Sequence, residues 1–273
     1  AVVLGALFQL GVFSSSSFAP RASPGSCQVY RPNGPYSTSL INLEGVCNGQ
    51  LPQYVGVFVG GANQYIATPD PMPTSAITLV AWVYMTSDPT NYPRIIGDIY
   101  NNGVTWYGYG MYIGQNSNNF DTEINAGGAF GQPGCGTLSL NAWHFVLMAY
   151  SSATGTLLCY VDGAVRGTST LSGQITYASG HSYSTYIGSN PQVSTGAFPG
   201  SIADVQMYNA SLSVPEANAL YIEGIGGAPV TLQSLVGWWP LNGNANDYSG
   251  NNNNGVPSGV SYTSQWTSGY TPP

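Results

Sequence analysis

Residues 157–166 read LLCYVDGAVR, and this stretch decides the fold class of the chain. The apolar run 157–161 is followed directly by Asp162 and Gly163. These two residue types suit a two-residue type I′ turn, because both central positions of that turn need positive φ. A second short run, 164–166, comes straight after the turn. The stretch therefore predicts a β-hairpin.

Short runs of the same kind occupy much of the chain from about residue 40 onward. They are rich in β-branched and aromatic residues and are separated by turn residues, which is typical of strands in a sandwich or barrel. The predicted strands are 55–59, 64–67, 77–85, 95–100, 107–113, 143–150, 156–161, 183–187 and 202–208. A chain of 273 residues can form one large all-β domain or two small ones.

One helix is expected, over residues 213–222. Ser213 can cap its N-terminus, Pro215 suits the first turn, and Glu216 stands three residues after the cap. Gly224 follows as the stop signal.

The composition is poor in charge. Only 5% of residues are charged, the formal net charge is -7, and the four basic residues are all arginines. Nucleic-acid binding needs clustered cations, so this composition excludes it. Disorder is also disfavoured, because the chain is 43% hydrophobic and 12% aromatic.

The first thirteen residues, AVVLGALFQLGVF, alternate with a period of two. Every even position is apolar, and these positions are Val2, Leu4, Ala6, Phe8, Leu10 and Val12. Four serines, 14–17, follow at once, so the segment has no hairpin partner beside it. We expect a donor strand that inserts into the sheet of a second copy of the chain.

Three alternatives exist for this segment. It could be an edge strand of its own domain. A membrane span needs about 18 apolar residues, and this run is shorter. A secretory signal begins with basic residues, and none precedes Arg21, so the start resembles that of a processed chain.

The four cysteines, Cys27, Cys47, Cys135 and Cys159, show no CxxC spacing, which argues against a metal site. Two disulfides fit an extracellular protein at the cell surface. Four cysteines allow three connectivities, and sequence proximity suggests Cys27 with Cys47 and Cys135 with Cys159. Asn209 begins an Asn-Ala-Ser glycosylation sequon.

Several stretches together resemble the laminin-G-like or concanavalin A-like jelly-roll family. In chain order they are AWVY (81–84), WHFV (143–146), YVDG (160–163), YIG (186–188) and FPGSIADVQMYNASLS (198–213). The resemblance covers about residues 55–222. It implies an all-β sandwich of two antiparallel sheets, with a short helix after the last strand.

Residues 235–255, LVGWWPLNGNANDYSGNNNNG, resemble the opening strand and loop of the same family, although here they come last. A permuted order explains this, since chain ends often lie close together. A truncated second domain is the alternative. We therefore divide the chain into a donor strand and serine hinge (1–17), a Ser/Pro/Gly linker (18–39) and a jelly roll (40–273), with 235–260 supplying the usual first strand and loop.

The N-terminal strand is surplus to this family plan. Such a chain resembles archaeal extracellular filament subunits, in pili or threads joined by donor-strand complementation. That resemblance implies a non-enzymatic homo-polymer used in adhesion. The alternative is a monomeric lectin-like module that binds surface glycans.

The acids and histidines form no recognisable catalytic motif. Glycoside hydrolases on related sandwiches carry Glu-x-Asp-x-x-Glu on a strand. The nearest match is Asp121 and Glu123, two residues apart. On a strand they would share a face and could form a pair with Asp98, but we expect these to be loop acids. His144 and His181 are near no serine or cysteine in a recognisable motif, so no catalytic residue is predicted.

Two binding features remain open. The loop 242–254 combines many asparagines with Asp247, and Asp70 follows a predicted strand, so calcium is an alternative to our expectation of no cofactor and no metal site. Aromatic residues could form a sugar-stacking platform or pack across strands. They are Tyr84, Trp106, Tyr107, Tyr109, Tyr112, Tyr177, Tyr183 and Tyr186.

Overall fold

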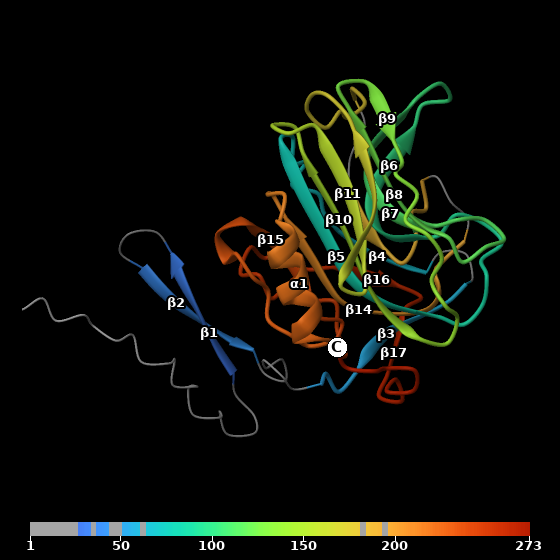
Figure 1. Cartoon of the computed structure of the whole chain (residues 1–273). Coiled ribbons are helices and arrows are strands. Elements are labelled where there is room, and N and C mark those ends of the chain that lie inside the picture. The colour runs from blue at the N-terminus through green and yellow to red at the C-terminus, as the bar shows by residue number, and fades with distance from the viewer. Residues whose placement is uncertain (1–26, 34–36, 44–50, 61–63, 181–183, 193–195) are drawn as a thin grey trace, which may run out of the picture.

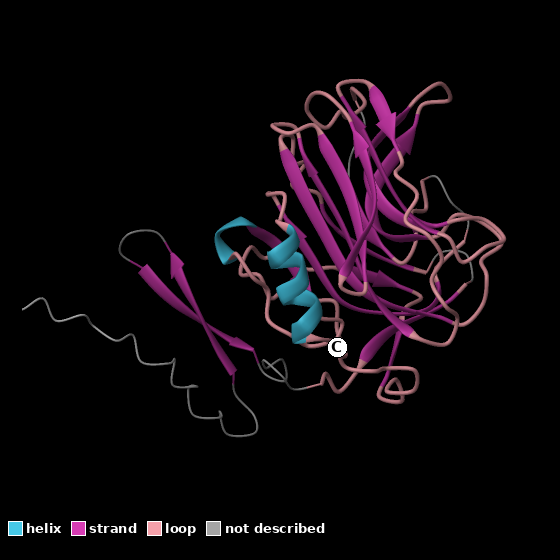
Figure 2. Cartoon of the chain, in the orientation of Figure 1, coloured by secondary structure: helices cyan, strands magenta, loops and turns pink. Residues whose placement is uncertain are grey.

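The computed structural model describes residues 27–33, 37–43, 51–60, 64–180, 184–192 and 196–273, with side chains from residue 51 onward. Two antiparallel sheets pack face to face, and the α-helix α1 (Val214–Glu223) lies against one outer face of the sandwich (Figures 1 and 2). The jelly-roll prediction is confirmed. The backbone of β1 (Cys27–Asn33) and β2 (Ser37–Leu43) forms a further two-stranded sheet.

The larger sheet has eight strands in the order β12-β11-β10-β5-β14-β3-β17, and β15 also pairs with β14. Its strands are β3 (Val55–Val59), β5 (Ala76–Met85), β10 (Trp143–Ser151), β11 (Thr156–Val161), β12 (Ala164–Thr170), β14 (Pro199–Tyr208), β15 (Leu235–Trp239) and β17 (Ser261–Thr263).

The smaller sheet has seven strands in the order β16-β4-β13-β6-β7-β8-β9. Its strands are β4 (Tyr65–Pro69), β6 (Arg94–Asn101), β7 (Trp106–Ile113), β8 (Phe120–Ala126), β9 (Ala129–Gly131), β13 (Ser184–Ile187) and β16 (Val256–Ser258).

Strand β5 shows why the sequence forms two apolar layers. Alternate residues such as Leu79 and Val83 belong to the core between the sheets. Val80 and Trp82 point the other way, into a second cluster that includes Leu220 of α1. Because both faces of β5 are covered, the strand is apolar at almost every position.

The hairpin and the helix form as predicted. Asp162 and Gly163 have φ of 47° and 82°, as a type I′ turn requires, and β11 pairs with β12. The N–H and hydroxyl of Ser213 each donate to Glu216 Oε2 at 2.7 Å. These hydrogen bonds lower the pKa of Glu216. The short 3₁₀ helix η2 (Leu232–Ser234) lies between α1 and β15.

Strand β15 brings the C-terminal stretch into the sandwich. It pairs antiparallel with β14, which is the neighbourhood that the permuted order requires, although the domain boundaries themselves stay a prediction. Trp239 points into the core, and its Nε1–H donates to Asn253 O at 2.9 Å. Trp238 points into the outer cluster. A Cβ on Gly237 would lie 2.2 Å from the Trp239 ring, so a glycine is needed beneath it.

Parts of the sequence interpretation need correction. The linker predicted over 18–39 overlaps β1 and the start of β2, where β-formers such as Val29 and Tyr30 occur. Strands β8 and β9 were missed because their apolar runs are short and interrupted by polar residues. The predicted donor-strand residues, Val2 to Val12, lie outside the described residues. Within the described part, no helix is long and apolar enough to cross a membrane.

Replacing Trp239 tests the role of the C-terminal stretch in the core. Trp239→Ala should lower stability by about 3–5 kcal/mol, because it removes a ring that is 1% exposed and leaves a cavity. The midpoint of thermal unfolding (Tm) should fall by roughly 10 °C. Trp106→Ala, at a half-buried position on β7, is the control and should cost much less. Equal losses would contradict the prediction.

Candidate functional site

A hollow of about 430 Å³ lies at one end of the sandwich, where β3 and β5 end and β14 begins. It is lined by both apolar and polar residues. The apolar ones are Val57, Phe58, Val59, Pro89, Ala197 and Pro199, and the polar ones are Thr86, Ser87, Asp88, Thr90, Asn91 and Ser201. A concave site with an apolar floor and a few polar groups is the usual form of a small-ligand site.

The loop 86–91 that forms one wall is held at both ends. The N–H and hydroxyl of Thr86 donate to Pro199 O at 2.9 and 3.1 Å. Asn116 N–H donates to Pro89 O at 2.7 Å, and Gln115 Nε2 donates to Thr90 O at 2.9 Å. A wall fixed in this way loses little conformational entropy when a ligand binds.

Gly200 allows the strands to close beneath the hollow. Its φ is 157°, and a Cβ there would lie 1.9 Å from Tyr84 O. A side chain at this position would therefore push β14 away from β5.

A charged cluster lies on the outer face of the seven-stranded sheet. It begins at Arg94, three residues after the loop 86–91 that lines the hollow. Arg94 Nη2 and Glu123 Oε1 are 2.8 Å apart, and both side chains are 4% exposed. The guanidinium lies over the Tyr112 ring, 4.8 Å from its centroid. The ladder shifts register between Arg94 and Ile96, so both Ile95 and Ile96 reach the core while Arg94 faces outward.

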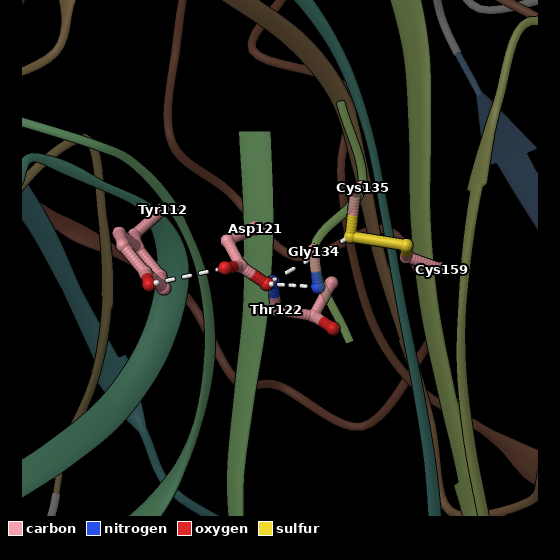
Figure 3. Close-up of a disulfide and its surroundings, with 6 residues drawn as sticks. All are labelled: Tyr112, Asp121, Thr122, Gly134, Cys135 and Cys159. Carbon is pink, nitrogen blue, oxygen red and sulfur yellow. Dashed lines mark hydrogen bonds between the residues drawn. A yellow bond between two sulfur atoms is a disulfide. The ribbon is translucent and has the colours of Figure 1, made fainter. Parts of the chain in front are cut away.

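Figure 3 shows how Asp121 joins this cluster to the disulfide. Asp121 accepts hydrogen bonds from Thr122 N–H at 2.8 Å, Gly134 N–H at 3.1 Å and Tyr112 OH at 3.4 Å. The next residue after Gly134, Cys135, is bonded to Cys159 of β11. The disulfide thus ties the segment beside β8 to the eight-stranded sheet. Cys47 and the side chain of Cys27 lie outside the described part.

The two acids on β8 are not loop acids, so that expectation was wrong. Asp121 and Glu123 share one face of the strand. Burial raises the pKa of Glu123 to about 7, even though Arg94 acts in the opposite direction, and burial also raises the pKa of Asp121. A carboxyl near pKa 7 suits acid–base chemistry, but the ion pair closes Glu123 off from solvent.

Asp98 is not brought together with these two acids. It lies opposite Tyr109 in the β6–β7 ladder, whereas Glu123 lies opposite Gly110, so Asp98 points to the other face of the sheet. There it is fully buried beside Asp70, which accepts a hydrogen bond from Tyr109 OH at 2.7 Å. Burial, then the hydrogen bond and charge of Asp70, raises the pKa of Asp98 to about 10. Asp98 therefore keeps its proton at neutral pH.

The carboxylate of the asparagine-rich loop is already engaged in hydrogen bonds and is a poor calcium ligand. Asp247 accepts hydrogen bonds from the N–H groups of Trp238, Ser249 and Asn253 at 2.8–2.9 Å. Its oxygens therefore organise the loop. Asp70, the other residue considered for calcium, lies beside Asp98. No group of three or more His, Cys, Asp or Glu side chains within the described ranges could hold a metal.

The aromatic residues do not form one platform. Tyr84 packs against Trp143 on the eight-stranded sheet, and Tyr109 is in the core. Tyr186 packs edge-on against Tyr65 at 5.5 Å on the other sheet. The other aromatic residues of the predicted platform also lie apart from one another. Trp106 and Tyr107 begin β7, and Tyr112 lies under Arg94. Tyr177 packs against the core, and Tyr183 lies outside the described part.

His144 does meet a serine, contrary to expectation. It lies at the start of β10, between Ser139 of the preceding turn and Asp162 of the β11–β12 turn. These residues are distant enough in sequence to form no local motif. His181 lies outside the described part, and Asn209 is exposed just after β14.

The family comparison agrees with the fold. A family model described as the concanavalin A-like lectin/glucanases superfamily matches residues 60–218. No curated protein matches the chain.

Three solved structures with a similar fold illustrate the likeness, each with its TM-score, sequence identity and coverage. A candidate carbohydrate-binding protein from Bacteroides ovatus has a TM-score of 0.58 at 19% identity, over 78% of this chain and 60% of that one. The SAP-like pentraxin of Limulus polyphemus has a TM-score of 0.52 at 14% identity, and the match covers 77% of this chain and 94% of the pentraxin. The CBM40 of a Ruminococcus gnavus sialidase has a TM-score of 0.50 at 14% identity, and the match covers 61% of this chain and 97% of the CBM40. At these identities, the likeness shows the fold alone.

The protonated Asp98 predicts that stability falls as pH rises. The pKa of Asp98 is raised from 3.8 in the unfolded chain, so its contribution is fully present below about pH 4 and is lost toward pH 10. Asp98→Asn keeps a donor beside Asp70 without the ionisation. We expect its Tm at pH 8 to exceed that of the native chain by roughly 5 °C, with a smaller gap at pH 4.

Thermal unfolding between pH 3 and pH 9 measures this effect. Glu223→Gln, at an exposed acid, is the matched control and should change the profile little. A native Tm that rises from pH 4 to pH 8, or a parallel profile for Asp98→Asn, would refute the assignment of the proton.

Proposed function

From the premise that the chain belongs to the concanavalin A-like lectin/glucanases superfamily, we propose that it binds carbohydrate in the hollow at the ends of β3, β5 and β14. The observation that carries this proposal is the mixed lining of the hollow. Hydroxyl, amide and carboxylate side chains line it together with apolar ones. A sugar ring presents the complementary surface, with hydroxyls at its edge and C–H groups on its faces.

The volume and charge of the hollow indicate which class of carbohydrate it can bind. A volume of about 430 Å³ falls within the range of small-molecule sites and suits one or two sugar rings. Asp88 is the single charged residue among those that line it. A neutral sugar fits this lining better than an anionic one, because Asp88 would repel a carboxylate or sulfate.

Binding is a better interpretation than glycoside hydrolysis. Hydrolysis needs two carboxyl groups on either side of an accessible sugar. Asp121 and Glu123 share a face, but Glu123 is closed off by Arg94, and Asp98 is in the core. The hollow itself has one carboxylate. The proposed role is therefore recognition, in an extracellular protein whose Cys135–Cys159 disulfide suits an oxidising environment.

Two variants test the hollow. Asp88→Ala removes its carboxylate, and Ser87→Trp places a large side chain at its exposed wall. On a glycan array with the full chain, followed by calorimetry on the sugar that binds, each should weaken binding at least tenfold. Glu223→Gln, at an acid outside the hollow, should leave binding unchanged. If the native chain binds no glycan, or if both variants bind as well as it does, the proposal fails.

Polymerisation into a filament is a second candidate. Strand β12 is the outermost strand of the eight-stranded sheet and pairs only with β11 among the described strands. It is largely exposed, and Val165 is 41% exposed. An edge of this kind can accept a strand from another copy. The apolar alternation of residues 1–13 makes that segment the proposed donor.

Deleting residues 1–16 tests the filament directly. By negative-stain imaging, the full chain should form filaments and the truncated chain should not, while keeping its Tm. Val165→Pro, which places a residue without an N–H on the β12 edge, should also reduce assembly. Filaments from the truncated chain would exclude the donor-strand mechanism.

A further inference from the structure

We propose that Ser139, His144 and Asp162 form a hydrolytic triad in which Ser139 attacks carboxylic esters. Ser139 Oγ lies 2.7 Å from His144 Nε2. On the other side of the ring, Nδ1 lies 2.6 Å from Asp162 Oδ2. Nucleophile, base and orienting carboxylate are thus joined in a row, which is the arrangement that activates a serine.

The hydrogen bonds assign the roles of the two ring nitrogens. A carboxylate only accepts hydrogen bonds, so the contact with Asp162 places the proton of the neutral ring on Nδ1. Nε2 is then left with a lone pair facing Ser139 Oγ. Asp162 is itself fixed, because its Oδ1 accepts the N–H of Phe145 at 2.8 Å. The carboxylate therefore orients the base, as a positioning residue does.

The triad is open to a substrate. Ser139 is exposed, and the side chains of His144 and Asp162 are 15% and 29% exposed. Leu140, the residue after the nucleophile, is also exposed, and its N–H is the proposed donor to the oxyanion. The N–H of Ser139 also points at Nε2, at 3.1 Å, and shares its lone pair. With a single proposed oxyanion donor, we expect slow ester hydrolysis.

The triad lies at the same end of the sandwich as the hollow. The start of β10 pairs with the end of β5, and Asn141 N–H donates to Met85 O at 2.8 Å, next to Thr86 of the hollow. Leu138 N–H donates to Asn118 O at 2.9 Å, in the loop whose Asn116 also holds the wall of the hollow. An acyl group on a sugar bound there is the substrate class that this position favours, and this part rests on the proposed function.

The chemistry is an ordinary acyl transfer. Ser139 Oγ forms a bond to the ester carbonyl carbon, and its proton passes to His144 Nε2. The bond to the leaving alkoxide then breaks, and that oxygen takes the proton from Nε2. Water attacks the acyl-serine in the second half, giving its proton to Nε2, and the carboxylic acid leaves as Ser139 regains its hydrogen.

A fluorophosphonate probe and p-nitrophenyl acetate test the triad on the full chain. The probe should attach to Ser139, identified by peptide mass spectrometry, with loss of fluoride. Ser139→Ala should abolish this labelling, and His144→Gln should slow it at least tenfold. Asp162→Asn keeps the turn but donates to Nδ1, which moves the ring proton to Nε2, so it should slow labelling and change its pH profile.

Two control variants distinguish a reactive Ser139 from a serine that only holds the turn. Ser264→Ala removes an exposed serine elsewhere and should label like the native chain. Glu223→Gln, at an exposed acid outside both sites, should also hydrolyse p-nitrophenyl acetate like the native chain. Neither the probe nor this ester contains a sugar, so the labelling result does not depend on glycan binding and the two proposals fail independently. If Ser139 takes no label, or if His144→Gln labels at the native rate with an unchanged Tm, Ser139 and His144 have a structural role alone, and the proposal is overturned.

Discussion

Strand β5 lies in the middle of the eight-stranded sheet, and both proposed sites depend on its pairings, the hollow on its pairing with β14 and the triad on its pairing with β10. The contact of Thr86 with Pro199 O joins two lining residues of the hollow that are 113 apart in sequence. On the other side of β5, the start of β10 carries His144. The approach at Gly200 is so close that any side chain there would separate the strands, which would disturb the hollow and the core together.

Three of the few acidic residues of the chain are buried, and each is paired, protonated or hydrogen-bonded. Glu123 is paired with Arg94, and Asp98 keeps its proton beside Asp70. Asp204 accepts hydrogen bonds from Trp238 Nε1 at 2.8 Å and from Gln206 Nε2, and burial still raises its pKa to about 6. In each case burial raises the pKa of the carboxyl, so these acids favour the folded state most at acidic pH.

Local signals predicted the fold well, and the sites poorly. The turn residues Asp162 and Gly163 and the cap Ser213 act through contacts a few residues apart, so sequence was enough to place them. The faces of Asp98 and Glu123 depend on the β6–β7–β8 register, which no local pattern encodes. The hollow is a product of three strand ends, and sequence alone gave no indication that segments near 58, 88 and 199 would meet.

The triad shows how a site can arise from residues that the fold already requires. His144 belongs to the stretch that begins β10, and Asp162 to the turn of the hairpin, so strand pairing alone brings this pair together. Asp162 would be needed there without any chemistry, because the turn demands positive φ and Phe145 N–H needs an acceptor. Only Ser139 comes from outside this framework, on the turn that enters β10. A single hydroxyl in that turn therefore separates a structural His–Asp pair from a nucleophile with its base.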